Sequence, residues 1–380
     1  MTSKERHQAR YLRRQEKRER NKSKVACECD DFDEVFPYSK IYKAYKKCCR
    51  NVGWKASTQL YKANATYNVY LAYKKLKDGT FKSDGFYEFD LPERGKVRHI
   101  KSVTMRERVV QRCLCDYSLT PMTSRVLIYD NGASSKNKGY DFAIKRLEKQ
   151  VHHFYNVYHT NLGYILLYDF SKFFDSLKHD LLKGILHGIY KNEKIKNLVF
   201  HFIDMFGNRG LGLGSQISQN LALISVNRLD HYVKEFLRIK GYGRYMDDGY
   251  LIHLDKEYLQ KCFNDIKRIS DELGVVLNTR KTRIARLDKG FTFLKIRFFL
   301  LSTGKLIEKV YPPSVTRMRR RLKKFKRLYD EGKMSLFDIK QSYQSWESHI
   351  KKRNSYRTRQ SMRKLFKSLF GGYDVQNTKK

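Results

Sequence analysis

The chain has 380 residues, of which 41% are hydrophobic and 14% aromatic, so it can build a large core and is not wholly disordered. Its 79 Lys and Arg against 39 Asp and Glu give a net charge of +40, and self-repulsion of this size predicts a polyanionic partner. Nucleic acid is the leading candidate, and an acidic membrane surface is the alternative.

Three further features of the sequence limit where the protein can reside. No run of about 18 apolar residues is present, so we expect no membrane span. The basic N-terminus lacks the apolar core of a signal peptide, which argues against secretion. The seven cysteines, an odd number without zinc-finger spacing at Cys27, Cys29, Cys48 and Cys49, predict reduced thiols and a cytoplasmic location.

The N-terminal third begins with a strongly basic stretch. Residues 1–24 hold ten Lys and Arg, three acids and almost no apolar residue, which predicts either a solvated arm or a polar helix. Residues 86–91 alternate as a strand does, and the basic turn at 93–100 leads into a second strand. Apolar spacing then predicts helices over 105–119 and 142–158, separated by a loop.

The middle of the chain alternates between short strands and helices. A buried strand is predicted over 164–169 and a strand-turn-strand over 243–253. Helices are predicted over 179–190, 219–237 and 257–273, and another strand over 291–299. Residues 312–380 hold 20 Lys and Arg against five acids, with apolar residues at helical spacing, so they predict a separate helical subdomain that faces phosphates.

Acidic residues mark the strongest candidate site. In Tyr245-Met246-Asp247-Asp248 two carboxylates adjoin at a strand turn, which is unfavourable unless a cation neutralises them. Asp169 ends the predicted buried strand and can reach the same cleft. Two Mg²⁺ ions about 3.5–4 Å apart could be held by Asp169, Asp247 and Asp248. Asp175 is as well explained by a helix cap as by catalysis.

These motifs, in this order, resemble those of reverse transcriptases. Tyr245-Met-Asp-Asp resembles the catalytic turn, and Asp169-Phe-Ser-Lys-Phe-Phe-Asp-Ser resembles the first catalytic-acid motif. Between them, Leu213-Gly214-Ser-Gln-Ile-Ser218-Gln219 resembles the nucleotide-and-template motif. Two later fragments, Leu277-Asn-Thr-Arg-Lys281-Thr and Gly290-Phe-Thr-Phe-Leu, resemble the next motif and the primer grip, and the order over residues 93–295 is specific.

The variant of the nucleotide motif narrows the resemblance. Many reverse transcriptases carry Gln-Gly-x-x-x-Ser-Pro, whereas this chain has Leu213 and Gln219 at the two ends. That form resembles prokaryotic enzymes of diversity-generating retroelements, as do Arg108-Val-Val and Asp130-Asn-Gly-Ala-Ser. Related enzymes of uncharacterised bacterial groups act in antiphage defence.

The resemblance implies a role for each site residue. Asp169, Asp247 and Asp248 would bind the metal ions with the Phe170 backbone carbonyl, and Mn²⁺ could replace Mg²⁺. Phe174 would be the gate that excludes a ribose 2′-OH, with a core aromatic as the alternative. The nucleotide would also be bound by Lys96, Arg98, Gly214, Gln219 and Lys281.

Together these observations predict an α+β right-hand polymerase. We expect a basic arm at 1–31, fingers at 32–160, a palm with an antiparallel sheet at 161–300 and a helical thumb at 301–380. The implied function is RNA-directed DNA synthesis, with an RNA template, a DNA or RNA primer and deoxynucleotides as partners. A structured noncoding RNA or a small basic accessory protein are further partners to consider, and a membrane is not. A non-catalytic RNA-binding protein, a metal-dependent nuclease and template-independent synthesis are the alternatives.

Overall fold

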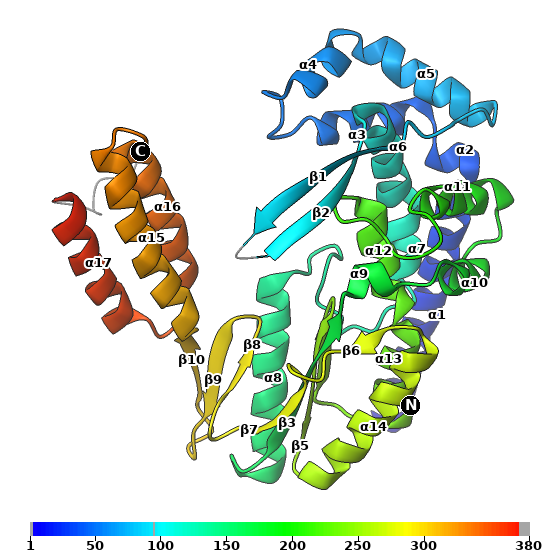
Figure 1. Ribbon diagram of the computed structural model, residues 1–380. Helices are drawn as coiled ribbons and strands as arrows, with labels where there is room; N and C mark the ends of the chain where they lie inside the picture. The colour runs from blue at the N-terminus through cyan, green and yellow to red at the C-terminus, as the bar shows by residue number, and fades with distance from the viewer. Residues whose placement is uncertain (1–2, 94–95, 372–380) are drawn as a thin grey trace. The chain divides into compact units, whose positions relative to one another are not determined.

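The computed structural model describes residues 3–93 and 96–371, and its contacts divide the chain into two units (Figure 1). The first unit comprises Met1–Ala143, Tyr168–Gly249 and Cys262–Thr282. The second comprises Ile144–Leu167, Tyr250–Lys261 and Arg283–Lys380. Both are discontinuous because strands β3 (Tyr164–Ser171) and β5 (Asp248–His253) and helix α14 (Lys256–Glu272) each pass from one unit into the other.

Helices make up most of the first unit. The stretch left open as an arm or a polar helix is helical, as α1 (Ser3–Cys29). The helices that follow are α2 (Phe32–Val35), α3 (Tyr38–Cys48), α4 (Ala56–Ala63), α5 (Ala65–Lys77), α6 (Met105–Leu114), α7 (Thr120–Ser124), α9 (Phe173–Ser176), α10 (His179–Ile189), α11 (Glu193–Asp204), α12 (Gln216–Ser225) and α13 (Asn227–His231). Helix α6 follows the predicted spacing, because Val109, Val110, Cys113 and Leu114 are all buried.

Two π-helical turns interrupt predicted helices. The segment predicted as one helix over 105–119 changes to a π-turn at Cys115–Leu119. The helix predicted over 219–237 begins earlier, at Gln216, and breaks at Val226, whose backbone leaves the helical region with φ −110° and ψ 19°. It resumes as α13 and ends in a second π-turn, Tyr232–Phe236.

A β-hairpin and one larger sheet carry the predicted site residues. Strands β1 (Phe86–Glu93) and β2 (Lys96–Val103) pair antiparallel, as their alternation predicted, with Arg98 opposite Leu91. The larger sheet has the order β4-β5-β3-β6, where β4 is Tyr242–Tyr245 and β6 is Val276–Leu277, and β7 (Arg283–Arg286) also pairs with β3. The predicted strand at 164–169 and strand-turn-strand at 243–253 are therefore confirmed.

The second unit ends in a small sheet and three helices. Strands β8 (Phe291–Phe293), β9 (Ile296–Leu300) and β10 (Leu306–Val310) form an antiparallel sheet, and α8 (Tyr140–Tyr158) contributes most of its length to this unit. The single strand predicted over 291–299 is wrong. Leu294 and Lys295 adopt φ of 45° and 63°, so the backbone reverses between β8 and β9.

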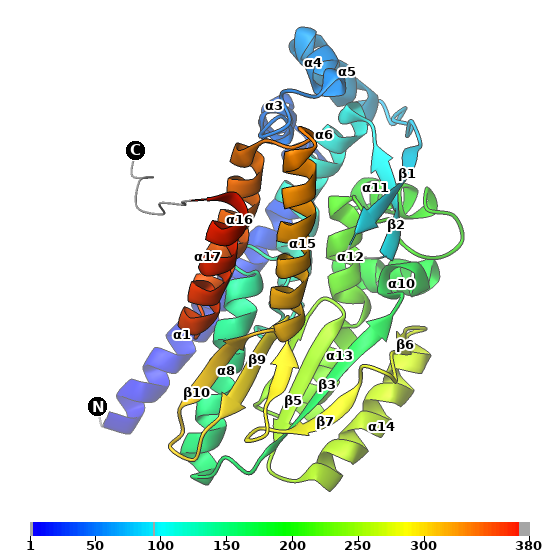
Figure 2. The same ribbon diagram turned by 60° about the vertical axis from the view of Figure 1, so that its left-hand side comes forward.

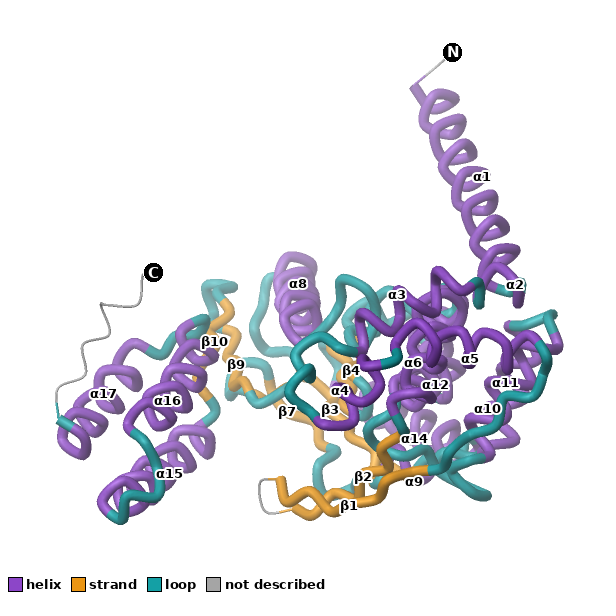
Figure 3. The backbone as a smooth tube through the Cα atoms, turned by 90° about the horizontal axis from the view of Figure 1, so that it is seen from above, coloured by secondary structure: helices purple, strands orange, loops and turns teal. Residues whose placement is uncertain are grey.

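Helices α15 (Pro312–Asp330), α16 (Leu336–Lys351) and α17 (Tyr356–Phe370) lie side by side (Figures 2 and 3). Their shared core includes Met318, Leu322 and Phe325, which the helical spacing had predicted, together with Tyr343 and Phe366. None of the described helices combines the length and the apolar character that crossing a bilayer requires. The proposed boundaries of fingers, palm and thumb stay predictions.

Candidate active site

Two tight reversals of the backbone present the predicted acids. Strand β3 is buried along most of its length and ends two residues after Asp169, where Lys172 takes a left-handed conformation with φ 45°. The β4–β5 connection consists of Met246 and Asp247, and Met246 has φ 54°. A left-handed non-glycine residue costs roughly 1–2 kcal/mol, so each of these turns stores backbone strain beside an acid.

Main-chain hydrogen bonds bring the acid-bearing segments together. The Phe170 N–H donates to the Asp247 carbonyl oxygen at 3.3 Å, which places the end of β3 against the β4–β5 turn. The Asn278 N–H donates to the Asp169 carbonyl oxygen at 2.7 Å. Three segments far apart in the sequence therefore meet at one point, all within the first unit.

A lysine supplies the positive charge at this point. The Lys281 Nζ donates to Asp169 Oδ2, and this hydrogen bond raises the pKa of Lys281. Burial raises the pKa of Asp247, the negative charge of Asp169 raises it further, and the positive charges of Lys281 and Arg98 act in the opposite direction. Asp169 and Asp247 are thus close enough for their charges to interact, and Lys281, on which Asp248 also acts, offsets part of the repulsion.

The β1–β2 hairpin extends the site. Arg98, on β2, is exposed and its charge acts on Asp247. Further along β2, the Lys101 N–H donates to the Leu213 carbonyl oxygen at 3.2 Å, so the hairpin adjoins the predicted nucleotide motif. The side chain of Lys96 lies outside the described residues, although its backbone begins β2.

The predicted nucleotide motif spans the start of α12: residues 213–215 precede the helix, residues 216–219 lie in it, and Gly214 and Gln219 are its exposed members. Gly214 has φ +114°, and a Cβ there would lie 3.3 Å from the Lys101 carbonyl oxygen, so glycine relieves both strain and crowding. Gln219 is exposed, and its Oε1 accepts a 3.3 Å hydrogen bond from Ser134 Oγ. Ser134 belongs to the loop at residues 130–139, which this contact joins to the motif.

The predicted gate differs from its neighbours in burial. Phe170 and Phe173 are buried and their rings stack at 5.4 Å. Phe174 is only half-buried and meets Phe173 edge to face at 5.8 Å. Of the three aromatics in this motif, Phe174 is therefore the one with ring surface available to a ligand.

The family model for reverse transcriptase (RNA-dependent DNA polymerase) matches residues 82–298, which is more than half of the chain. The chain belongs to the reverse transcriptase family. The predicted α+β right-hand polymerase fold is confirmed, and the matched region contains both acid-bearing turns, Lys281 and Arg98.

Solved structures of telomerase resemble the chain more distantly. Apo telomerase from Candida tropicalis, truncated from its C-terminal domain, is 17% identical with a TM-score of 0.45, and covers 59% of this chain and 55% of its own. The apo telomerase of the same yeast is 14% identical, with a TM-score of 0.45 and coverages of 60% and 49%. Candida albicans telomerase, in complex with a fragment of telomeric RNA, is 13% identical, with a TM-score of 0.48 and coverages of 82% and 59%.

The chain spans about half to three-fifths of the length of these telomerases. No curated protein matches it.

Reverse transcriptases use divalent metal ions, and the acids of this one fit such ions by their chemistry. Carboxylate oxygens are the donors that hard cations such as Mg²⁺ and Mn²⁺ prefer. Within the described residues no three His, Cys, Asp or Glu side chains are already gathered as a metal-binding group. In this arrangement Asp169 is paired with Lys281 instead.

A network of buried polar side chains contacts the acidic turn of the reverse transcriptase from its core side. Arg244, wholly buried, donates from Nη2 to Asp230 Oδ2 at 2.6 Å and from Nη1 to the Met246 carbonyl oxygen at 2.8 Å. Tyr242 donates to Asp230 Oδ1 at 2.6 Å and shares a 2.9 Å hydrogen bond with Tyr168. The network thus holds the carbonyl group of the strained turn residue itself.

Sequence reasoning missed this network, although β4 carries a signal for it. Tyr242 and Arg244 alternate onto the same face of β4, and both are buried. An arginine on the buried face of a strand requires a partner, because an unpaired buried charge is strongly unfavourable. The partner, Asp230, lies 14 residues earlier on a different element, so the pattern alone does not identify it.

Gly249, directly after Asp248, was also missed. A Cβ at Gly249 would lie 2.1 Å from the Tyr168 ring, so the neighbouring strand leaves no room for a side chain. The acidic turn is therefore flanked by an anchoring arginine on one side and a required glycine on the other.

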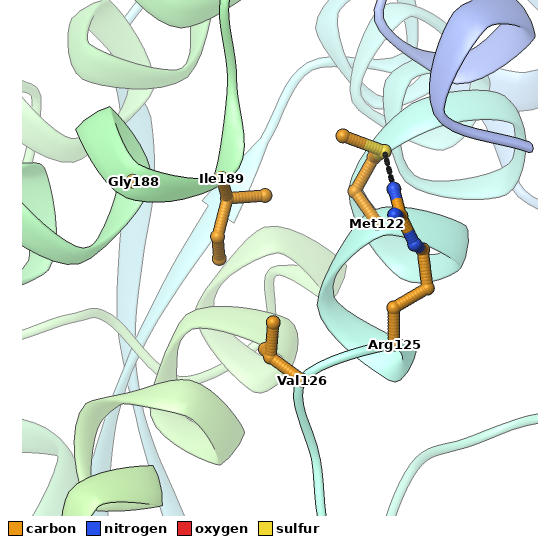
Figure 4. Close-up of a pocket in the computed structure, with 5 residues that line it drawn as sticks. All are labelled: Met122, Arg125, Val126, Gly188 and Ile189. Atoms are coloured by element: carbon orange, nitrogen blue, oxygen red, sulfur yellow. Dashed lines mark hydrogen bonds between the residues drawn. The ribbon is translucent and has the colours of Figure 1, made fainter. Parts of the chain in front are cut away.

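Two cavities of the first unit lie away from the predicted site residues. The smaller, of about 170 Å³, is lined by Met122, Arg125, Val126, Gly188 and Ile189, with a 3.6 Å contact from Arg125 Nη1 to Met122 Sδ (Figure 4). The larger, of about 340 Å³, lies between α2, α11 and the end of α5. None of the residues proposed for metal or nucleotide binding lines either cavity.

The buried ion pair makes a first prediction. Arg244→Leu leaves Asp230 charged and unpaired in the core, so the free energy of unfolding should fall by about 3–5 kcal/mol. Urea denaturation followed by circular dichroism measures this change. The matched control is the double variant Asp230→Leu/Arg244→Leu, which should recover most of the loss. Equal urea midpoints for Arg244→Leu and the native protein would refute the structural role.

The pKa of Asp247 makes a second prediction. Because burial raises this pKa in the folded state, the native protein binds more protons than the unfolded chain between the ordinary and the raised value. Stability contributed by this residue therefore falls as pH rises through that window and stays reduced above it. Asp247→Asn should raise the thermal midpoint at pH 7 in metal-free buffer, with the gain vanishing below about pH 4.

A matched control is Asp271→Asn, which neutralises an exposed carboxylate on α14. It should show no comparable gain at pH 7. An Asp247→Asn protein that is less stable than the native protein at every pH would mean that the carboxylate is stabilised by its surroundings.

Proposed function

We propose that this protein is an RNA-directed DNA polymerase whose catalytic residues are Asp169, Asp247 and Asp248. The observation that carries the proposal is the meeting of the end of β3, which carries Asp169, with the β4–β5 turn, joined by the Phe170 to Asp247 main-chain hydrogen bond. In a chain of the reverse transcriptase family, acids gathered at one point repel one another unless a cation neutralises them, and burial already makes Asp247 harder to ionise. Metal binding during catalysis would explain why the three acids are present at this point.

The proposed cofactor is a pair of Mg²⁺ ions, which Mn²⁺ could replace. Asp169, Asp247, Asp248 and the Phe170 carbonyl oxygen would hold them. When bound, such ions activate an attacking hydroxyl and stabilise a departing pyrophosphate. The chain's own part is to keep the turns in place before any ion arrives, through Arg244 on the Met246 carbonyl group.

Two cations of the chain are placed to act on the triphosphate. Lys281 stays protonated, because its hydrogen bond to Asp169 raises its pKa. From its position beside Asp169, the protonated Lys281 ammonium could contact the pyrophosphate or give it a proton. Arg98, exposed on the hairpin, can bind phosphate oxygens through two N–H groups at once. Lys96 is proposed for the same purpose from the start of β2.

The substrates follow from the same assignment. The proposed partners are an RNA template, a DNA or RNA primer and deoxynucleotides, bound in large part through the net charge of +40. Gly214, exposed just before α12, and Gln219, exposed on α12 itself, are proposed to face the nucleotide and template. The proposed location is the cytoplasm.

The biological setting we propose is a diversity-generating retroelement. The support is sequence alone: Leu213 and Gln219 stand where many reverse transcriptases have Gln and Pro. Leu cannot make the amide hydrogen bonds of Gln, which favours an enzyme of low accuracy. The second candidate is antiphage defence with a structured noncoding RNA, which the same motif variant and the Asp130-Asn-Gly-Ala-Ser loop also favour.

Loss of a catalytic acid is the main test of the proposed activity. Asp247→Ala and Asp248→Ala should each abolish primer extension, while RNA affinity changes less than about threefold because the basic surface provides it. Extension of a labelled primer on a defined RNA and filter binding of that RNA give the two readouts. Asp271→Ala serves as the control that keeps full synthesis. Synthesis by the Asp247→Ala protein, or product unrelated to the template in the native protein, would overturn the proposal.

The half-buried ring of Phe174 predicts that the enzyme selects deoxynucleotides over ribonucleotides. Phe174→Ala should admit ribonucleotides while deoxynucleotide use continues, because the ring would no longer meet a 2′-OH. Primer extension with each nucleotide type measures the ratio. Phe173→Leu is the matched control, since Phe173 is buried and should affect stability rather than selection. Unchanged discrimination in the Phe174→Ala protein would move the gate to another residue.

Leucine in place of glutamine at position 213 predicts a lower accuracy of cDNA synthesis. Restoring a hydrogen-bonding side chain with Leu213→Gln should lower the error rate roughly fivefold, corresponding to about 1 kcal/mol for one hydrogen bond. Sequencing cDNA made on a defined RNA by both proteins measures the errors at each template base. Equal error rates would favour the defence setting over diversification.

A further inference from the structure

Helices α3 to α5 carry a surface that the proposed polymerase site does not use. The family model begins at residue 82, so the whole segment precedes the matched region. Figures 1 and 2 both show α4 and α5 at one end of the first unit, beyond the β1–β2 hairpin. Their outward surface is therefore not part of the matched polymerase region.

The charge of this segment is entirely of one sign. Residues 35–77 contain ten Lys and Arg and not one Asp or Glu. The same stretch contains seven of the chain's tyrosines and one of its two tryptophans. A segment that combines cations with aromatics is complementary to a polyanion whose repeating units have planar rings.

The aromatics on this surface are not there to fill a core. Helix α5 buries Val69, Ala72 and Leu76, which form one stripe at spacings of three and four residues. Tyr67 and Tyr70 lie on the opposite side and are 62% and 49% exposed. Since two tyrosines in water contribute little to packing, their position calls for a ligand.

Lysines continue the same outward stripe. Tyr67, Tyr70, Lys74 and Lys77 follow at spacings of three, four and three, which places all four on one face of α5. All four are exposed. At about 1.5 Å per residue the stripe extends roughly 15 Å, a length that a few nucleotides of single strand can cover.

A second aromatic lies just before α4. Trp54 is 75% exposed, and the Lys55 ammonium lies 5.5 Å from the centre of its ring. An indole with one face in water and a cation beside it offers a base both a stacking surface and a nearby charge for its phosphate. Aromatics combined with a basic groove are how proteins bind single strands with little regard to sequence.

We propose that Trp54, Tyr67, Tyr70, Lys74 and Lys77 form a binding surface for single-stranded RNA, separate from the polymerase site. Bases stack on the three rings and the lysines neutralise the phosphates. Duplex nucleic acid fits this surface poorly, because its bases are already stacked and cannot reach the rings. Binding needs neither a primer nor deoxynucleotides, so it does not depend on the proposed catalytic function.

Trp54 itself provides the test. The chain has two tryptophans, and Trp346→Phe leaves Trp54 as the sole indole of the full-length protein. A labelled uridine dodecamer, without primer or nucleotides, is titrated while Trp54 emission and the anisotropy of the label are recorded together. We expect saturable quenching of Trp54 that parallels the anisotropy, and no such quenching by a blunt duplex of equal length.

Variants separate stacking from charge. Tyr67→Ala/Tyr70→Ala should weaken the quenching isotherm roughly tenfold or more, given the usual effect of losing stacked bases. The control, Phe236→Ala, removes another exposed ring elsewhere on the first unit and should change nothing. Lys74→Ala/Lys77→Ala should lower the slope of log affinity against log salt by about two, whereas Lys256→Ala/Lys261→Ala on α14 should not affect the Trp54 signal.

The outcome is decided by where the RNA binds. RNA that raises the anisotropy without changing Trp54 emission would overturn the proposal, because the strand would then lie elsewhere and the rings would be left for a protein partner. Equal affinities for the tyrosine variant and its control would overturn it as well. Primer extension on a short template is unaffected by either result, so failure of this surface and failure of the polymerase assignment are distinguishable.

Discussion

A buried ion pair anchors the acidic turn of the candidate site. Arg244 and Asp230 neutralise each other in the core, and the same guanidinium reaches the carbonyl group of Met246 in the acidic turn. A surface loop with two adjacent carboxylates and a left-handed residue has no reason to keep one conformation. Because Asp230 fixes the guanidinium, the hydrogen bond from Arg244 to the Met246 carbonyl oxygen ties the turn to the buried core.

The ion pair also separates a neutral core from the acidic residues. On the core side of the β4–β5 turn, the charges of Arg244 and Asp230 cancel and Tyr242 and Tyr168 use the remaining hydrogen-bonding capacity. On the side of Asp169 and Asp247, Lys281 pairs with Asp169, and the charges of both Lys281 and Arg98 act on Asp247. The buried pair on the core side of the turn is thus electrically neutral, whereas the turn itself carries two adjacent carboxylates.

Much of this could be predicted from sequence because the informative patterns are local. The strand ending at Asp169, the turn at Asp247 and the helices 105–114 and 179–189 follow from periodicity within a few residues. The errors came where backbone conformation overrode periodicity: Leu294 and Lys295 turn the chain within an apolar run, and Val226 breaks a helix. The Arg244–Asp230 pair and the fit of Gly249 against Tyr168 needed the structure, since each joins residues on separate elements whose proximity no spacing rule gives.

The contact between Lys281 and Asp169 has a consequence for how each new molecule is made. The two residues are 112 positions apart in the chain. At the usual 5–20 residues per second of synthesis, the ribosome needs roughly 5 to 20 seconds to travel from one codon to the other. Throughout that interval the nascent polypeptide carries Asp169, the first of the proposed catalytic acids, without the lysine that pairs with it. The ion pair can therefore form only after Lys281 has been synthesised, so the acid Asp169 is made well before the cation that offsets its charge.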